Sequence, residues 1–279
     1  MPRHLTLSHL KLRWLWVAAS LVLVVVLAIG SFWAARAILE PPQPAAASTE
    51  STVSPPASTP SNTPIKTVAP SVPALSPDYV LPPIQDGMVP VITKIPTAQK
   101  VVFLTIDDGA SKLPENLALL QENKIKASLF LAKLFISDKP DYFKPFLAAG
   151  HKIENHSISH PLNLVKMSYQ QQKDEICQMA DFEEQTYGRR PVFFRPPGGP
   201  YSSVTRKAAA DCGMKAIIDW EAKANAGRVD YQTGTALRPG EIVLMHFRPE
   251  FAKDLQAFIE AKNAAGLEVV LLEDYLKVP

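Results

Sequence analysis

From Lys100 onward, short apolar runs alternate with helix-like segments, and this alternation constrains the fold more than any other feature of the chain. Seven runs have the length and composition of buried strands, namely 101–105, 127–132, 151–155, 192–194, 215–219, 241–246 and 267–272. The helix-like segments between them are 114–123, 141–149, 168–187, 201–211 and 252–265. Strands that alternate with helices favour a parallel sheet. We therefore predict an α/β fold, a distorted β/α barrel of about seven parallel strands, closed or nearly closed.

Polar side chains cluster at the carboxyl ends of these predicted strands. They are Asp107 and Asp108 after the first strand, His156 after the third, Arg195 after the fourth, and Asp219 and His246 at the ends of the fifth and sixth. The carboxyl ends of the strands form the face on which β/α barrels build active sites. A random scatter of acidic residues and histidines would not sort in this way, so the sequence predicts a site at this edge.

A metal site is indicated by His156 and His160, which are four residues apart. Imidazoles one helical turn apart can bind one metal, and a carboxylate can complete a three-ligand site with an open position for water. Each element alone has a plainer interpretation: Asp-Asp-Gly as a turn, His246 as a hydrogen-bonded core histidine, and 195–199 as a rigid loop. Their joint position at strand ends favours a hydrolase.

The charge of the chain gives no indication of nucleic-acid binding. The net charge is +2, and no stripe of Lys and Arg is evident. Nucleic-acid partners are therefore not expected, and no protein partner is predicted.

The N-terminal region contains an apolar segment, 14–35, without a charged residue. It is long enough for the roughly 20 residues that a bilayer-spanning helix needs. Because 1–13 carries Arg and Lys, we expect this part to stay in the cytoplasm and the rest of the chain to lie outside, in a single-pass membrane protein. A cleaved signal peptide is the alternative, but the apolar stretch exceeds the roughly 7–15 residues typical of one, so an uncleaved anchor is favoured. Cleavage would give a secreted protein.

Residues 36–80 are rich in Pro, Ser, Thr and Ala, a composition typical of a disordered linker, and 81–279 is the predicted catalytic domain. Cys177 and Cys212 are too few for a disulfide framework. Outside the cytosol they could pair, but we expect two independent buried thiols.

Four motifs of the domain resemble those of the polysaccharide deacetylase family, also known as the NodB homology domain or carbohydrate esterase 4. They are TIDDG (105–109), HSISH (156–160), RPPGG (195–199) and LMH (244–246). The resemblance covers roughly 100–276, which is nearly all of the predicted folded part. It implies a divalent metal held by Asp108, His156 and His160. This ligand set suits Zn²⁺, with Co²⁺ or Mn²⁺ as alternatives.

The resemblance also implies roles for the other motif residues. Asp107 would be the general base, Arg195 would hold that base in place, and His246 would be the general acid. The backbone N–H of Gly198 would help to bind the oxyanion, and Leu244 would line the pocket for the acetyl methyl group.

Two positions depart from the family pattern. Asp219-Trp220 resembles the fourth motif in an uncertain register, so Asp219 is a candidate partner that tunes His246. Trp220 is a candidate substrate-binding residue or, alternatively, a core tryptophan. Gly199 stands where many members have an aromatic residue, which suggests a more open groove wall.

The resemblance therefore implies a metal-dependent hydrolase that removes N-acetyl groups from a cell-surface or cell-wall polysaccharide. Peptidoglycan or a chitin-like N-acetylglucosamine polymer is the expected substrate. The alternatives are hydrolysis of another small amide or ester, and a catalytically silent wall-binding module.

Overall fold

The computed structural model describes residues 76–279. The predicted cytoplasmic segment 1–13, the predicted membrane span 14–35 and the linker up to residue 75 lie outside the described residues. Within 76–279, the helices are too short or too polar to cross a bilayer.

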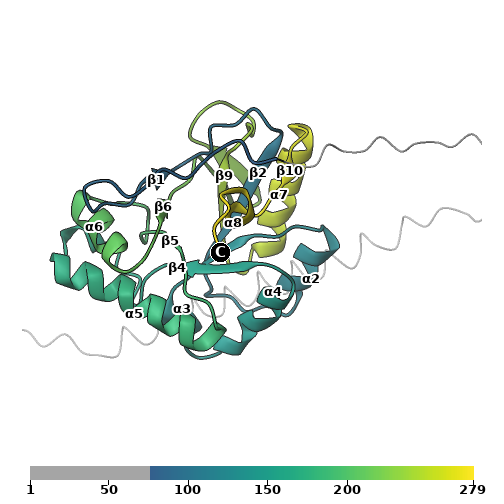
Figure 1. Ribbon diagram of the computed structural model, residues 1–279. Coiled ribbons are helices and arrows are strands. Elements are labelled where there is room, and N and C mark those ends of the chain that lie inside the picture. Colours follow the sequence, from purple (N-terminus) through teal and green to yellow (C-terminus); the bar gives the residue numbers. More distant parts are fainter. Residues whose placement is uncertain (1–75) are drawn as a thin grey trace, which may run out of the picture. The chain divides into compact units, whose positions relative to one another are not determined.

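A ten-stranded sheet forms the centre of the domain (Figure 1). Its order is β1-β6-β5-β4-β3-β2-β9-β7-β8, and β10 pairs with β2 beside this path. The strands are β1 (Val91–Ile92), β2 (Val101–Asp108), β3 (Ser128–Leu131), β4 (Lys152–Asn155), β5 (Phe193–Phe194), β6 (Ala216–Ile218), β7 (Ala222–Asn225), β8 (Arg228–Tyr231), β9 (Ile242–His246) and β10 (Glu268–Val269). Each of the seven predicted runs overlaps one of these strands, which confirms the predicted, mostly parallel α/β sheet.

The sheet is a curled half-barrel, and the predicted closure is not formed. Its path ends at β1 and β8. The outer edge of β6 is occupied by β1, and the outer edge of β9 is occupied by β7. Both edges that could have met to close a barrel are therefore already paired.

An antiparallel hairpin of β7 and β8 was not expected from the sequence. Its two-residue turn, Ala226 and Gly227, has φ values of +53° and +72°, as the tight turns of twisted hairpins require. Along β7, Ala222 and Ala224 are buried in the core and alternate with half-buried residues. This alternation directs Lys223 and Asn225 to the opposite face of the strand.

Helices surround the sheet (Figure 1). They are α2 (Glu115–Glu122), α3 (Lys133–Ile136), α4 (Lys144–Ala148), α5 (Tyr169–Tyr187), α6 (Ser203–Asp211), α7 (Phe251–Ala264) and α8 (Leu272–Tyr275), with 3₁₀ turns η2 (Pro140–Phe143) and η3 (Leu164–Lys166). Both α5 and α6 begin at a capping box, in which a serine side chain accepts a hydrogen bond from the backbone three residues later. These caps fix where the two helices start.

Helices α5 and α6 pack side by side (Figure 1), and a disulfide joins Cys177 on α5 to Cys212 at the end of α6. The Cα atoms of the two cysteines are 4.9 Å apart. The prediction of two independent thiols is therefore wrong. Each helix is visible in the sequence, but the sequence periodicity does not say that these two helices pack against each other with both cysteines in the contact.

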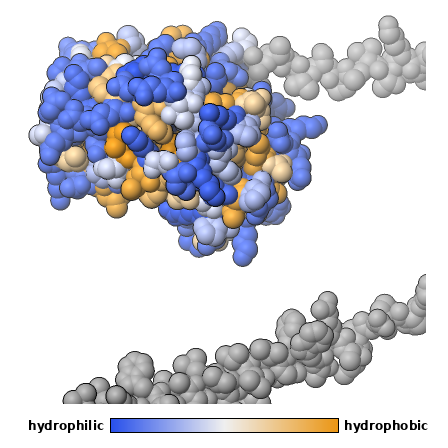
Figure 2. Space-filling model, turned by 90° about the horizontal axis from the view of Figure 1, so that it is seen from below, coloured by the Kyte–Doolittle hydropathy of each residue, from blue (hydrophilic) through white to orange (hydrophobic). Residues whose placement is uncertain are grey.

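The central strand β2 separates two hydrophobic cores. All eight of its residues are buried, and alternate side chains enter different clusters: Val102 and Leu104 one, Val101 and Phe103 the other. On the face shown in Figure 2, hydrophilic residues cover most of the surface, and hydrophobic residues lie in patches between them. β2 is thus held on both faces, which makes its carboxyl end a rigid platform.

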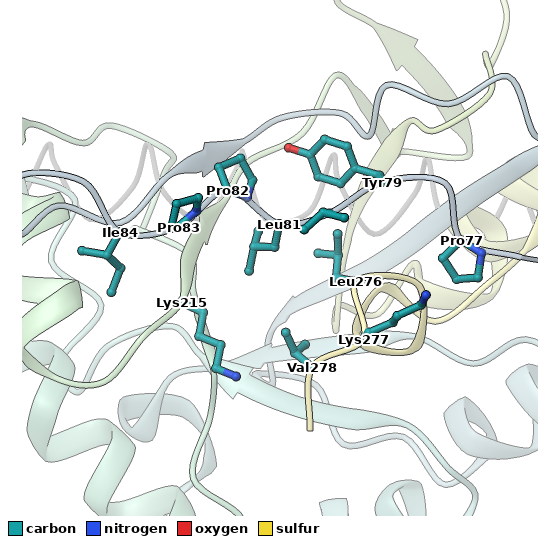
Figure 3. Close-up of a pocket in the computed structure, with 11 residues that line it drawn as sticks. Pro77, Tyr79, Leu81, Pro82, Pro83, Ile84, Lys215, Leu276, Lys277 and Val278 are labelled. Carbon is teal, nitrogen blue, oxygen red and sulfur yellow. The ribbon is translucent and has the colours of Figure 1, made fainter.

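The end of the predicted linker contacts the domain. Asp78 accepts hydrogen bonds from the side-chain hydroxyls of Tyr275, at 2.7 Å, and Thr97, at 2.9 Å. The folded domain thus extends upstream of residue 81. A cavity of about 420 Å³ lies between the segment 77–84 and the C-terminal residues 276–278 (Figure 3). Lys215, at its rim, precedes β6, so this cavity lies away from the carboxyl ends of the strands.

Candidate active site

A second cavity, of about 230 Å³, opens at the carboxyl ends of β2 and β9. It is lined by Asp107, Asp108, His156, His160, Leu162, Gly198, Trp220, Lys223, Leu244, His246 and Arg248. Eight of the ten residues that the sequence analysis assigned to the site are among them. The other two, Arg195 and Asp219, are joined to each other by a hydrogen bond from the guanidinium to the Asp219 carbonyl.

Three side chains converge as a metal site requires. The ligand atoms of Asp108, His156 and His160 all lie within 4.8 Å of one another. His160 Nε2 is 3.3 Å from Asp108 Oδ1, and His156 Nε2 is 3.6 Å from the same oxygen. Ligands that bind one tetrahedral ion at about 2.0–2.2 Å lie about 3.3–3.6 Å apart. The spacing therefore fits a divalent cation of this size.

The protonation of His156 also suits a ligand. Its Nδ1 is 2.7 Å from the carbonyl oxygen of Arg195. Because a carbonyl can only accept, Nδ1 carries the proton, and the lone pair of Nε2 faces Asp108. Burial lowers the pKa of His156 to about 3, so the ring is neutral at physiological pH.

The two histidines lie on a loop after β4, and not on a helix as their spacing suggested. Ser157 and His160 have φ values of +74° and +54°. The Asn155 side chain accepts a hydrogen bond from the Ser157 backbone N–H at 2.9 Å, and Ser157 Oγ accepts one from His160 N at 3.1 Å. These bonds tighten the turn and bring both rings to the same side.

Backbone geometry at Asp108 places two consecutive carboxylates in one pocket. Successive side chains of a strand point to opposite faces. Asp108, however, has a φ of +75°, a left-handed conformation that Asp tolerates better than most residues. Burial alone would raise the pKa of Asp108, but the hydrogen bond from His160 and the nearby His156 hold this pKa below its ordinary value.

Asp107 is paired with a fully buried arginine. Arg195 Nη1 donates to Asp107 Oδ1 at 2.7 Å and to the Thr105 hydroxyl at 2.8 Å. Its Nε donates to the Ile218 carbonyl at 2.9 Å, and its guanidinium carbon lies 4.3 Å from the centre of the Phe130 ring. Burial raises the pKa of Asp107, and the charge of Arg195 opposes this rise. Asp107 is thus a fixed carboxylate whose proton affinity exceeds that of an exposed aspartate.

His246 faces the two aspartates across the sheet. Strands β9 and β2 are paired in the register that places His246 beside Asp107. Burial lowers the pKa of His246, and the charges of Asp107 and Asp108 oppose this effect. The Nδ1 atom of His246 is buried and finds no hydrogen-bond partner among residues 76–279.

Asp219, the candidate partner for tuning His246, makes no hydrogen bond to it in the described part of the chain. Instead, Asp219 Oδ1 accepts from the backbone N–H of Trp220 at 3.1 Å. The short aspartate side chain is turned back to its own backbone, so it does not orient the imidazole.

Trp220 forms the wall near Gly199. A Cβ atom at Gly199, whose φ is +97°, would lie 2.9 Å from Cη2 of Trp220. The expectation of a more open groove at this point is wrong, because the indole ring occupies the space. Leu244 and Gly198 line the same pocket as Trp220.

Three further residues line the pocket and were not predicted from the sequence, namely Lys223, Arg248 and Leu162. The Ala-Lys-Ala-Asn alternation that ends at an Ala-Gly turn was the available indication of a strand carrying Lys223. Arg248 lies two residues after His246, beyond the end of β9.

Comparisons with known proteins agree with this geometry. The family model described as polysaccharide deacetylase matches residues 94–217. An uncharacterized protein of Streptomyces coelicolor, SCO4760, is 35% identical over 198 residues, which are 67% of this chain and 77% of that protein. A peptidoglycan-N-acetylglucosamine deacetylase of Bacillus cereus is 28% identical over 163 residues, which are 55% of this chain and 75% of that protein.

The fold has solved counterparts. A mutant of BA3943, a CE4 family pseudoenzyme of Bacillus anthracis, has restored enzymatic activity, and its structure matches with a TM-score of 0.58 and 26% identity. The match covers 67% of this chain and 71% of that one. By its sequence match, its half-barrel fold and its converging motifs, the chain belongs to the polysaccharide deacetylase family.

Proposed function

We propose that the protein is a metal-dependent hydrolase that removes N-acetyl groups from a cell-wall or cell-surface glycan. The observation that carries the proposal is the convergence of three functions in one pocket: a possible cation site, a carboxylate held by an arginine, and a histidine. The relative from B. cereus is named as a deacetylase of peptidoglycan N-acetylglucosamine, which supports the same reaction here.

Asp108, His156 and His160 would hold the cation, most suitably Zn²⁺, with Co²⁺ or Mn²⁺ as alternatives. When bound, a divalent cation supplies Lewis acidity, which polarises an amide carbonyl and acidifies water. Two neutral imidazoles and one carboxylate leave it a net positive charge, as that role requires.

Asp107 would accept the proton of the attacking water. Its Oδ2 lies 3.6 Å from Nε2 of the ligand His156, so the carboxylate borders the place where that water would lie. Arg195 fixes the other oxygen, which leaves Oδ2 to accept the proton. A raised pKa brings the base closer to neutral pH, where proton transfer is most effective.

Gly198 and His246 would complete the reaction. Attack of water on the acetamide carbon places a negative charge on the carbonyl oxygen, and the Gly198 N–H would donate to it. One such donor contributes about 10²–10³ in rate. His246 would then protonate the sugar nitrogen as the C–N bond breaks, which releases acetate and a free amine. Leu244 offers an apolar contact for the acetyl methyl group.

The test is acetate release from N-acetylglucosamine oligomers and from peptidoglycan, with Zn²⁺ or Co²⁺ and after treatment with EDTA. We expect release that depends on the metal and is lost in His156→Ala. A folded protein that binds metal and releases no acetate from either glycan would contradict the proposal. Release of acyl groups only from small amides or esters would favour the rival hydrolase.

A silent wall-binding module is the second candidate, because a pseudoenzyme of the CE4 family shares the fold. The presence of ligands, base and acid together in one pocket favours catalysis. Equal glycan binding by the unaltered protein and by His246→Ala, without acetate release from either, would support the binding module.

We further propose that residues 14–35 anchor the protein in the cell membrane, with the catalytic domain outside the cytoplasm. The disulfide of Cys177 and Cys212 supports an exported domain, because disulfides persist in oxidising compartments. We expect the native protein to fractionate with membranes and to resist extraction with high salt. A soluble protein with a new N-terminus near Ala37 would instead indicate cleavage and secretion.

A further inference from the structure

We propose that Lys223 and Arg248 form an anion-binding subsite at the rim of the pocket, which selects N-acetylated sugars bearing a carboxylate. The inference rests on the proposed function, because it names the class of glycan that the deacetylase would prefer. It concerns two residues outside the four motifs.

Lys223 reaches the pocket from the hairpin that the motifs do not include. On β7 it is in register with Leu244 of β9, a residue that also lines the pocket. On the neighbouring strand Lys223 is opposite Asp230, but that carboxylate is bound to Arg228 at 2.9 Å. Within residues 76–279 no carboxylate lies within 4 Å of the Lys223 ammonium group. Its charge is therefore available to a ligand.

Arg248 reaches the same pocket from the end of β9. Its Nη1 donates to Asn225 Oδ1 at 3.3 Å, and its Nη2 lies 4.0 Å from Asp108 Oδ2. The side chain is 44% exposed, so the long pair with Asp108 is weak. A cation bound to Asp108 would weaken it further. Asn225 thus orients a guanidinium whose other N–H donors make no hydrogen bond within residues 76–279.

The charges of the pocket leave a positive excess at this rim. Asp107 is paired with Arg195, and Asp108 belongs to the possible cation site. The remaining two charges, those of Lys223 and Arg248, are both positive. The chain as a whole has a net charge of only +2, so this excess is local and does not reflect a generally basic surface.

The rest of the rim suits a sugar ring. Leu162, on the loop after β4, is 70% exposed, and the Trp220 ring lines the same pocket. In the sheet order, β4 is separated from β9 and β7 by β3 and β2. A sugar could thus contact Leu162 at one part of the pocket and place a carboxylate at the cationic part. The guanidinium fork matches the two oxygens of a carboxylate.

The test uses one glycan in two forms. The first is a peptide-free polymer of alternating N-acetylglucosamine and N-acetylmuramic acid, which has a lactyl carboxylate on every second sugar. The second is the same polymer with its carboxylates converted to neutral amides. We expect kcat/KM for acetate release to be about tenfold higher with the acidic form, the effect of one charge-assisted hydrogen bond. The preference should shrink at high salt.

The variant is Lys223→Gln combined with Arg248→Gln, and the matched control is Lys253→Gln. Lys253 is an exposed lysine on α7 outside the pocket. We expect the preference for the acidic form to fall to near one in the double variant and to persist in the control. A preference unchanged in the double variant, or absent from the unaltered protein, would overturn the subsite.

Calorimetric binding of the two glycans to metal-free protein separates this proposal from the proposed function. Tighter binding of the acidic form, abolished in the double variant, would support the subsite even if no glycan released acetate. Equal binding and equal turnover of the two forms would refute the subsite and leave the deacetylase intact.

Discussion

Buried charges gather in two regions of the domain. At the carboxyl ends of the strands, Asp107 and Arg195 form an ion pair beside an open pocket. In the second region, Glu154 of β4 and Arg189 form another ion pair, at 2.7 Å. Both arginines neutralise a buried carboxylate on the sheet. Only the first pair borders the metal-ligand cluster and the cavity.

The second region is buried, and it contains carboxyl groups whose pKa values are raised. Glu154 accepts hydrogen bonds from the backbone N–H groups of Val192 and Phe193, at 2.8 and 2.7 Å. Near it, burial and the charge of Glu154 raise the pKa of Glu273 to about 8, and burial raises that of Glu183 well above its ordinary value. Burial and a shifted pKa therefore do not by themselves identify a functional site. Convergence of ligands, base and acid on a cavity does.

The largest expected effect is the loss of stability when the arginine of either region is replaced. Arg195→Ala and Arg189→Ala each leave a buried carboxylate without its cation, which costs about 3–5 kcal/mol when the pair is fully buried. Arg195 has no exposed surface and Arg189 is 21% exposed, so the loss should be greater for Arg195. Urea unfolding measures both losses.

Activity then distinguishes the two arginines. Per folded molecule, acetate release should vanish in Arg195→Ala and persist in Arg189→Ala. Arg195→Lys, which keeps the charge but not the fork of donors, serves if Arg195→Ala does not fold. Equal loss of activity at both arginines would mean that the pair of Glu154 and Arg189 also supports catalysis, and the contrast between the regions would fail.

Next in size is the disulfide, which lies outside both regions. It closes a loop with a sequence separation of 35 residues. Replacing Cys177 and Cys212 with serine should lower the free energy of unfolding by about 4 kcal/mol, mainly because the unfolded chain gains freedom. Metal affinity at 25 °C should stay unchanged. A variant that folds fully yet binds metal weakly would show that α5 and α6 also shape the site.

A smaller effect, counted for each pH unit, should appear in the pH dependence of stability. The pKa of Glu273 is about 8 in the folded protein against 4.5 for an ordinary glutamate. Between these values the folded state holds a proton that the unfolded state releases, so stability falls as pH rises from 4.5 toward 8. Glu273→Gln cannot ionise. Its advantage over the unaltered protein should therefore grow by roughly 1.4 kcal/mol for each pH unit between these two values.

Thermal unfolding of both proteins between pH 4.5 and 9 measures this effect. Acetate release at neutral pH should be unaffected, because Glu273 lies in the second region. A difference in melting temperature between the two proteins that stays the same at every pH would contradict a protonated Glu273.

The sequence predicted the strands better than their closure. Runs such as 101–105 and 241–246 are apolar on both faces, so their burial is evident from composition alone. The hairpin of β7 and β8 was missed because β7 presents only two alanines to the core, too little apolar surface for an obvious strand. Without this hairpin, the open edge of the sheet could not be predicted.

The site was predictable where motifs are local and unpredictable where it depends on packing. Asp107, Asp108 and His156 were found because each follows a strand. The hydrogen bond of Asp219 to its own backbone, and the approach of Lys223 and Arg248 to the pocket, depend on turns and strand pairing that the sequence does not specify.

The two adjacent aspartates have different proposed roles, Asp107 as the general base and Asp108 as a metal ligand. Comparing variants of the two is therefore the most direct test of the proposed function. Metal content and acetate release are measured together for Asp107→Asn and Asp108→Asn, with each variant folded by circular dichroism. We predict that Asp107→Asn keeps about one bound metal and releases no acetate, whereas Asp108→Asn loses the metal. Loss of metal in both variants, or acetate release by Asp107→Asn at the normal rate, would contradict the division of a ligand from a base.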